Sequence, residues 1–180
     1  MKNLIVTFII FSITTFSCQK EKKFGFVDRS KAINEYQEKM DVEEKYKPLN
    51  EAFIKRRDSM IQAFQFEYRE AAIKAQRMSP QKQQELSQEF QQRDQLLTQQ
   101  IQVEQRNLEN SFNAEIDSSI VHFKKYVEQY GKDKGFFVIF GTSEATNTIM
   151  YGQDTIDVTE EIISGLNESY KKEETPTEKK

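Results

Sequence analysis

The chain has 180 residues, of which 37% are hydrophobic and 31% are charged, and its formal net charge is −3. So few apolar residues cannot fill one large globular core, which indicates a small domain with an extended part. Lys2 is the only ionisable side chain in residues 1–17, so removing that segment changes the net charge from −3 to −4. This balance is not typical of nucleic-acid-binding proteins, and we expect no nucleic acid among the partners.

Residues 1–17 have the features of an export signal. Lys2 precedes an uncharged apolar run over residues 4–16, which is shorter than the ~20 residues of a membrane-spanning helix. Cys18, the only cysteine, follows this run, so no internal disulfide can form. Its position resembles a bacterial lipobox, which implies an acylated Cys18, a lipidated tether over residues 18–22 and a membrane-anchored periplasmic protein. An unlipidated leader with an incidental cysteine is the alternative.

The next segment, residues 23–28, has the pattern of a short β-strand and ends in Asp28, a residue that caps helices well. A short helix over residues 29–37 is expected to follow and to bury Ile33 and Tyr36. These elements would form the first half of a body made from both chain ends.

Residues 41–119 predict a helical hairpin. No glycine lies between Gly25 and Gly131, and the sharpest helix-breaking pair in that span is Ser79-Pro80. Two long antiparallel helices joined by a tight turn at residues 79–80 fit this pattern, with Ser79 capping the second helix and Pro80 in its first position. Roughly 40 residues per arm at ~1.5 Å rise predict a projection of about 60 Å.

The start of the first arm is expected at Asp41, because Asp41-Val42-Glu43-Glu44 fits a capping box. Pro48 lies close to this start. It either occupies the first turn or kinks the arm near its base, and the sequence leaves both possibilities open.

Each arm carries one apolar stripe with steps of three, four and seven residues, which is typical of two helices that pack along a seam. The stripe of the first arm comprises Ile54, Ile61, Phe64, Tyr68, Ala71, Ala75 and Met78. The stripe of the second arm comprises Leu86, Phe90, Leu97, Ile101, Leu108, Phe112, Ile116, Ile120, Phe123, Val127 and Tyr130. Phe53 and Met60 lie beside the first stripe and are expected in the core.

After Gly135, residues 136–140 predict a strand that is buried on both faces, and residues 148–151 predict its partner strand. A second capping box over residues 157–160 opens a final helix that runs through Leu166. The charged tail, residues 171–180, lacks apolar anchors and is expected to be disordered.

The two chain ends, residues 23–40 and 120–170, are expected to form one small β-rich body. A sheet of few short strands leaves exposed edges and a thin core, and pairing between subunits would remove both defects. The fold class is therefore α+β, with a long antiparallel hairpin projecting from an oligomerisation body. The residues expected in that body are Phe24, Phe26, Val27, Phe137, Val138, Ile139, Ile149 and Tyr151.

No phosphate-binding glycine pattern, cluster of metal ligands or paired nucleophile and base occurs in the sequence, so we expect no enzyme, no metal and no cofactor. His122 is the only histidine. It lies on the second arm beside Ile120 and Phe123, where a structural or solvent-facing role is favoured over catalysis.

Short segments spread over nearly the whole mature chain resemble the Skp/OmpH family. They are Gly25-Phe26-Val27-Asp28, Asn34-Glu35-Tyr36 and residues 134–141, 149–152 and 156–162. The resemblance implies a periplasmic chaperone of outer-membrane proteins, built as a trimer whose bodies join while the helical arms enclose a cavity. The best-known relatives are strongly basic, whereas this chain has a sequence pI near 5.4. That difference favours apolar contact over charge-driven capture of a client.

Phe66 and Ile73 lie seven residues apart on a face of the first arm that the seam does not use. They could bind an unfolded client or pack against a neighbouring arm, and the sequence supports the two equally. Residues 69–82 carry a net charge of +3, four cations minus Glu70, which could attract acidic loops or anionic head groups, although a solvated helix end is the plainer interpretation. The candidate client-binding residues are Phe66, Ile73, Arg69, Lys74, Arg77 and Lys82.

Two hypotheses of function follow. The favoured one is an ATP-independent periplasmic holdase that keeps unfolded outer-membrane β-barrel proteins from aggregating, through weak contacts at many points that need no energy source for release. The alternative is a lipid-anchored envelope scaffold whose coiled-coil hairpin docks one specific folded partner.

Overall fold

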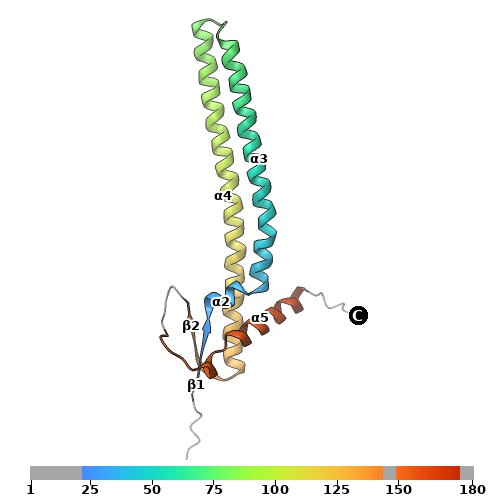
Figure 1. Ribbon diagram of the computed structural model, residues 1–180, viewed down its shortest axis with the longest axis vertical. Helices are drawn as coiled ribbons and strands as arrows, with labels where there is room; N and C mark the ends of the chain where they lie inside the picture. The colour runs from blue at the N-terminus through green and yellow to red at the C-terminus, as the bar shows by residue number, and fades with distance from the viewer. Residues whose placement is uncertain (1–21, 144–148, 175–180) are drawn as a thin grey trace, which may run out of the picture.

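The computed structural model describes residues 22–143 and 149–174. A long helical hairpin stands on a small body that both chain ends build (Figure 1), so the expected fold class is confirmed. The predictions for residues 1–21 and 175–180, the Cys18 tether among them, lie outside the described residues. Residues 171–174, expected to belong to a disordered tail, instead continue the last helix. The elements in chain order are β1 (Lys23–Asp28), α2 (Arg29–Asn34), α3 (Gln37–Ala75), α4 (Pro80–Asp133), β2 (Phe136–Thr142), the 3-10 turn η1 (Asp154–Ile156) and α5 (Thr159–Glu174).

The body contains a parallel pair of strands from opposite ends of the chain. Phe24 of β1 lies opposite Val138 of β2, and Asp28 lies opposite Thr142. The Val158 amide donates to the Phe26 carbonyl at 3.0 Å, so the segment that leads into α5 runs along β1. The Asp28 side chain accepts the Lys31 amide at 3.0 Å and caps α2, as its sequence position predicts.

The expected partner strand for β2 is wrong in the part that the structure describes, residues 149–151. These residues form no strand, and Met150 and Tyr151 are 90% and 82% exposed. The backbone of β2 pairs with β1 instead. Phe137 is 60% exposed and Phe140 is 46% exposed, so β2 is not buried on both faces either. The sheet has only two strands in the described residues, and the elements packed against it do not cover both of its faces.

The core of the body lies where the last turns of α4 meet α2 and α5. Gly165 lets α5 approach α4 closely, since a Cβ atom built there would lie 1.9 Å from the Tyr126 hydroxyl. The Tyr130 hydroxyl donates to Glu161 of α5, and burial together with that carboxylate raises the Tyr130 pKa above its ordinary value. The core residues are Val27, Ala32, Tyr36, Phe123, Tyr130, Val158, Ile162, Ile163 and Leu166.

α3 begins at Gln37, before the expected start at Asp41. Its N-cap residue, Tyr36, makes no side-chain capping bond. The Asn167 side chain of α5 accepts the Gln37 amide hydrogen at 2.8 Å instead. Asp41 therefore lies inside the helix, where it accepts a hydrogen bond from the Gln37 side chain at 2.7 Å. Pro48 also lies in the helix interior, which excludes the first-turn position.

The two long helices pack along a seam. On α3 this seam follows the expected stripe at Ile61, Phe64, Ala71 and Ala75 and departs from it at Ile54, Tyr68 and Met78, which are exposed. The expected stripe on α4 is confirmed, since all of its members are buried or half-buried. On α3, Phe53 is 5% exposed while its neighbour Ile54 is 37% exposed, so Phe53 faces α4 as expected and Ile54 does not. Tyr68 is 53% exposed, although its ring contacts Phe90 at 5.4 Å. Phe53 and Ile54 both line the groove that Leu108 also lines, and Phe53 is the more buried of the two.

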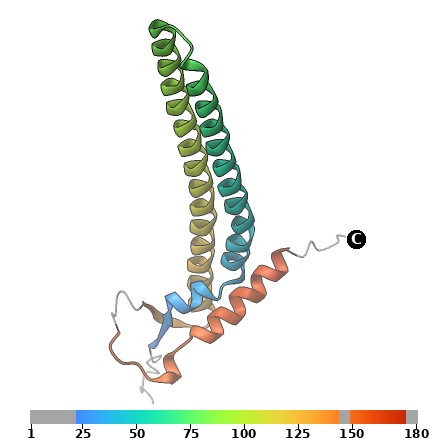
Figure 2. The ribbon, with the colours of Figure 1, turned by 45° about the horizontal axis from the view of Figure 1, so that its top comes forward.

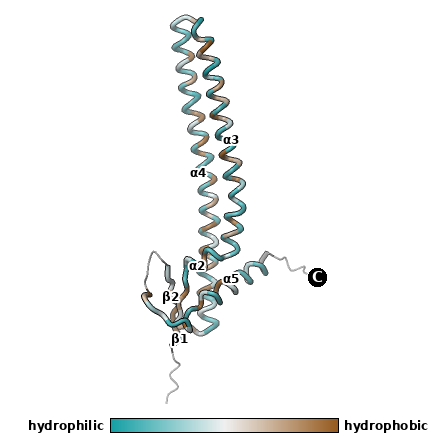
Figure 3. The backbone as a smooth tube through the Cα atoms, in the orientation of Figure 1, coloured by the Kyte–Doolittle hydropathy of each residue, from teal (hydrophilic) through white to brown (hydrophobic). Residues whose placement is uncertain are grey.

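The tip of the hairpin is the predicted turn. Ser79 is the N-cap residue of α4 and Pro80 is its first residue, although the Ser79 side chain makes no capping bond. The Gln83 side chain donates to the carbonyls of Ala75 and Met78 at 3.0 and 3.1 Å. One glutamine thus satisfies acceptors that the end of α3 leaves open. Hydrophilic positions predominate along the hairpin, with hydrophobic ones recurring at intervals (Figure 3).

Candidate functional site

The outer half of the arm exposes apolar side chains on both helices. Phe66 and Ile73 of α3 are each 61% exposed, as their off-seam positions predict. Leu96 and Val103 of α4, also seven residues apart, are 64% and 43% exposed. Sequence reasoning missed this second pair: Leu96 stands next to the seam residue Leu97, and Val103 lies between two polar residues, Gln102 and Glu104. The seven-residue spacing was the signal that could have identified them.

Leu96 and Val103 border a shallow groove on one side of the hairpin. One section, of about 370 Å³, has Met60, Phe64 and Leu97 in its lining, together with the ion pair between Glu67 and Arg93. The adjoining section shares Leu96 and Gln100 and extends to Val103. The outer arm thus carries a row of apolar side chains along this groove, with an ion pair among them.

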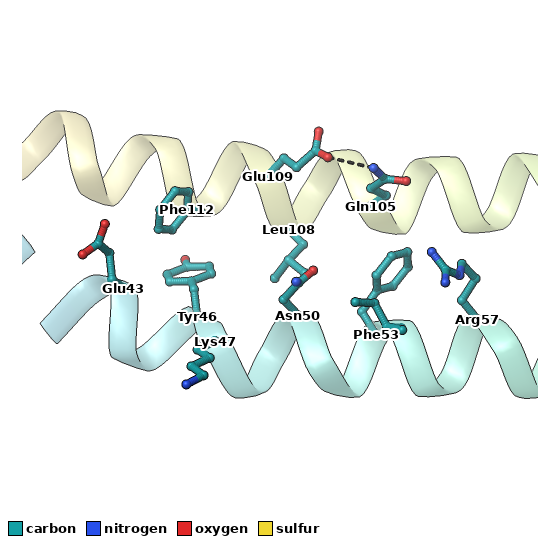
Figure 4. A pocket seen from close by; sticks show the side chains of 11 residues that line it. Glu43, Tyr46, Lys47, Asn50, Phe53, Arg57, Gln105, Leu108, Glu109 and Phe112 are labelled. Atoms are coloured by element: carbon teal, nitrogen blue, oxygen red, sulfur yellow. Dashed lines mark hydrogen bonds between the residues drawn. The ribbon is translucent and has the colours of Figure 1, made fainter. Parts of the chain in front are cut away.

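A second groove, of about 550 Å³, lies between α3 and α4 nearer to the body (Figure 4). Tyr46 and Phe112 face each other across it, with ring centroids 5.4 Å apart. Farther along, Leu108 points toward the side of α3 that carries Asn50. The lining of this groove combines apolar and aromatic side chains with four charged ones: Glu43, Lys47, Arg57 and Glu109.

Charged pairs fix the register of the two arms. Glu115 of α4 accepts from Lys45 and from the Tyr46 hydroxyl, both at 2.7 Å. The Lys45 ammonium, with the help of that hydroxyl, lowers the pKa of the Glu115 carboxyl below its usual value. His122 lies 2.9 Å from the Glu38 carboxylate, which is a structural contact between the base of α3 and α4. Other pairs across the seam are Glu67 with Arg93 and Arg56 with Glu104.

The four basic residues predicted to gather at the tip, Arg69, Lys74, Arg77 and Lys82, are all exposed. None of them takes part in the ion pairs formed within the described residues. Four carboxylates flank or interrupt the cluster, namely Glu67, Glu70, Glu85 and Glu89. The tip therefore presents mixed charge over its last turns rather than a large positive field.

The body exposes a second apolar surface, on the sheet. A hollow of about 560 Å³ is lined by Phe24, Phe26, Phe140, Ile149, Met150, Tyr151 and Ile156. Phe137 lies beside it, in an edge-to-face contact with Phe24 at 5.9 Å. We call these residues the body patch. Of the expected oligomerisation residues, Val27 instead belongs to the chain's own core, Ile139 packs against that core, and Val138 is half-buried.

Within the described ranges, no group of three or more His, Cys, Asp or Glu side chains is placed to hold a metal ion. Over the same residues, no helix combines the length and the apolar character that crossing a membrane would require.

A family model described as "Outer membrane protein (OmpH-like)" matches residues 23–166. The chain belongs to this OmpH-like family. A crystal structure from Caulobacter crescentus CB15, of a candidate outer membrane chaperone that is also OmpH-like, superposes with a TM-score of 0.71. The two chains share 11% sequence identity, and the match covers 83% of this chain and 86% of the other. No curated protein matches the sequence.

The match to the OmpH-like family spans the strand β1, the whole hairpin, the strand β2 and the first half of α5. At 11% identity, the likeness to the Caulobacter structure establishes a shared fold.

Proposed function

We propose that this OmpH-like protein is an ATP-independent periplasmic holdase that binds unfolded outer-membrane β-barrel proteins and prevents their aggregation before membrane assembly. The observation that carries the proposal is the exposure of Phe66, Ile73 and Leu96, each more than 60%, on an arm whose seam is already filled. Exposed apolar surface of this kind marks interaction sites. Family membership and the description of the Caulobacter structure as a candidate chaperone add support.

The form of the arm suits weak binding at many points. Its exposed apolar side chains are spread along a rod, and each offers a small contact area. Several weak contacts on one client act together, and each can break separately, so a client can leave without nucleotide hydrolysis. In the proposal, Phe66 and Ile73 make the apolar contacts, and the tip cations Arg69, Lys74, Arg77 and Lys82 provide secondary attraction.

The body patch supports an oligomer. Phe137 and Tyr151 are 60% and 82% exposed, and in the described residues the sheet has only two strands. A sheet that small is rarely stable with its apolar side in water. Pairing with further copies would cover the patch and the strand edge, and the family resemblance favours three copies. The arms of a trimer would then surround one client.

We also propose that Cys18 is acylated and tethers the protein to a membrane in the periplasm. The support is the apolar run at residues 4–16 and the cysteine that follows it directly. Residues 18–22 would then form a short polar link to β1.

The test is suppression of aggregation. The purified mature protein is expected to keep a urea-diluted outer-membrane barrel protein soluble at near-stoichiometric trimer concentration, and Phe66→Ser with Ile73→Ser is expected to weaken this activity several-fold at unchanged helicity. The matched control is Leu49→Ser with Val121→Ser, which removes residues 46% and 45% exposed outside the outer arm. No suppression by the parent protein would refute the holdase function. Equal activity of both double variants would remove Phe66 and Ile73 from the binding surface.

A pull-down from envelope extract separates the holdase from a scaffold. A holdase is expected to capture many different barrel proteins in unfolded form. Capture of one folded protein in a fixed ratio would instead support a scaffold whose hairpin docks that partner.

A further inference from the structure

The two arms enter the body in different ways. α4 runs from the tip into the core without a break, and Phe123 and Tyr130 near its end are core residues. α3 instead stops at a two-residue connection to α2, Glu35 and Tyr36, which we call the elbow. The base of α3 is therefore positioned by its contacts with α4 and by whatever holds the elbow.

Asn167 of α5 holds both sides of the elbow with one side chain. Its amide oxygen accepts the Gln37 amide hydrogen at 2.8 Å, and its amide nitrogen donates to the Glu35 carbonyl at 3.0 Å. Tyr36, the N-cap residue, makes no side-chain cap bond of its own. The cap of α3 is thus supplied by a residue 130 positions away in sequence. Figure 2 shows α5 passing beside the base of the hairpin.

Further contacts connect this point to α4. Tyr36 is 3% exposed, and its ring meets that of Tyr170, also on α5, edge to face at 6.0 Å. The Tyr36 hydroxyl donates to Glu38, whose carboxylate lies 2.9 Å from His122 of α4. The elbow is therefore the place where α5, α3 and α4 are joined.

We infer that α5 is a clasp that sets the angle between arm and body, with Asn167 as the positioning residue. While the clasp is closed, the arm has two supports, the continuous α4 and the held elbow. When the two Asn167 hydrogen bonds break, the first turn of α3 can fray at its base, and the continuous α4 then provides most of the resistance to bending at the body. The exposed apolar faces of the arm then change their direction relative to the body. This inference concerns the geometry of the chain and stands whether or not the arm binds clients.

Hydrogen exchange on the full chain tests the clasp. Asn167→Ala is expected to speed exchange of the amides at residues 37–40 by about fivefold, the effect of losing one N-cap. The amides of β1 and of the seam around Phe90 are expected to keep their rates. Asn167→Asp retains the acceptor for the Gln37 amide and is expected to give a smaller increase. The control is Asn113→Ala, at an exposed position of α4.

Distance measurement by double electron–electron resonance tests the angle itself. Spin labels at Gln76 near the tip and Ser164 on α5, in a Cys18→Ser background diluted with unlabelled chain, report the distance between arm and body. Asn167→Ala is expected to broaden the distance distribution, and Asn113→Ala is expected to leave it unchanged. Exchange rates and distribution widths equal to those of the control would overturn the inference. If Asn167→Ala fails to fold, an Asn167→Asp variant indistinguishable from wild type would overturn it equally.

Discussion

Replacement of Phe90 by alanine is expected to open the outer arm while leaving the body folded. Phe90 is 6% exposed, the most buried residue of the outer hairpin, and its ring lies 5.8 Å from Phe64 and 5.4 Å from Tyr68. The Arg93 guanidinium stands 5.0 Å above it. No other ring in the described outer hairpin is buried to that degree, so this cluster keeps the end of the arm closed.

The magnitude follows from burial. Removing a buried phenylalanine side chain costs about 3–5 kcal/mol, and a site open to solvent on two sides belongs at the lower end because it can close around the loss. About 3 kcal/mol corresponds to a hundredfold or greater increase in the open population. The matched variant is Phe66→Ala, at a side chain 61% exposed, for which the cost is expected to stay within about 0.5 kcal/mol. Both variants replace phenylalanine by alanine within a helix, so the change in helix propensity is the same and cancels when their unfolding free energies are compared.

Hydrogen exchange resolved by residue is the suitable assay, because contacts along the hairpin are local and the opening is expected to be local too. In Phe90→Ala, amides between residues 64 and 94 are expected to exchange about two orders of magnitude faster, while those of β1 and the base of α4 keep their rates. Equal protection in the Phe90 and Phe66 variants would refute the assigned seam. Acceleration over the whole chain would refute the view that the outer arm opens independently.

Two further predictions concern the base of the hairpin and the body. Because Lys45 and Tyr46 lower the pKa of Glu115, the stabilisation that they provide is present above the ordinary glutamate pKa of about 4.3 and is lost as the pH falls through the lowered value. The melting temperature of Glu115→Gln is therefore expected to fall less than that of wild type between about pH 5 and pH 3; parallel curves would contradict this. Light scattering is expected to give the mass of three copies for the mature protein and of one copy for Phe137→Glu with Tyr151→Glu, and mass spectrometry of the native N-terminus is expected to show an acylated Cys18. An unchanged mass of the double variant, or an unmodified cysteine, would refute the respective proposal.

The hairpin could be predicted from sequence because its signals are local. Ser79-Pro80 sets the turn through the fixed backbone of proline, and the stripe on α4 reports directly which face is buried. The start of α3 could not be predicted in this way. Its cap, Asn167, lies on another helix, and no pattern within a few residues of Gln37 contains that information. The capping box at Asp41 could start a helix there, but the hydrogen bond from the Gln37 amide to Asn167 places the start of α3 four residues earlier.

Strand pairing is even less predictable from local sequence signals than the start of α3. Residues 148–151 read as the partner of β2 because they come next in the chain, whereas the actual partner, β1, comes from the opposite end. Phe53 and Ile54 are adjacent in the chain and both line the groove beside Leu108, so periodicity alone does not decide which of the two is buried. Of the exposed candidates, Phe66 and Ile73 were predictable from their distance to the seam, while Leu96 and Val103 were missed although they too lie seven residues apart.

The parallel pairing of the two strands also imposes an order on folding. Lys23 pairs with Phe136, 113 residues later in the chain (136 minus 23). A newly secreted chain emerges with its first strand unmatched, and its two long helices can find each other through neighbouring contacts well before the matching strand has arrived. The two-stranded sheet of the body is therefore expected to form last. A chain interrupted before residue 136 would have a folded helical hairpin and an unpaired, aggregation-prone first strand at its base.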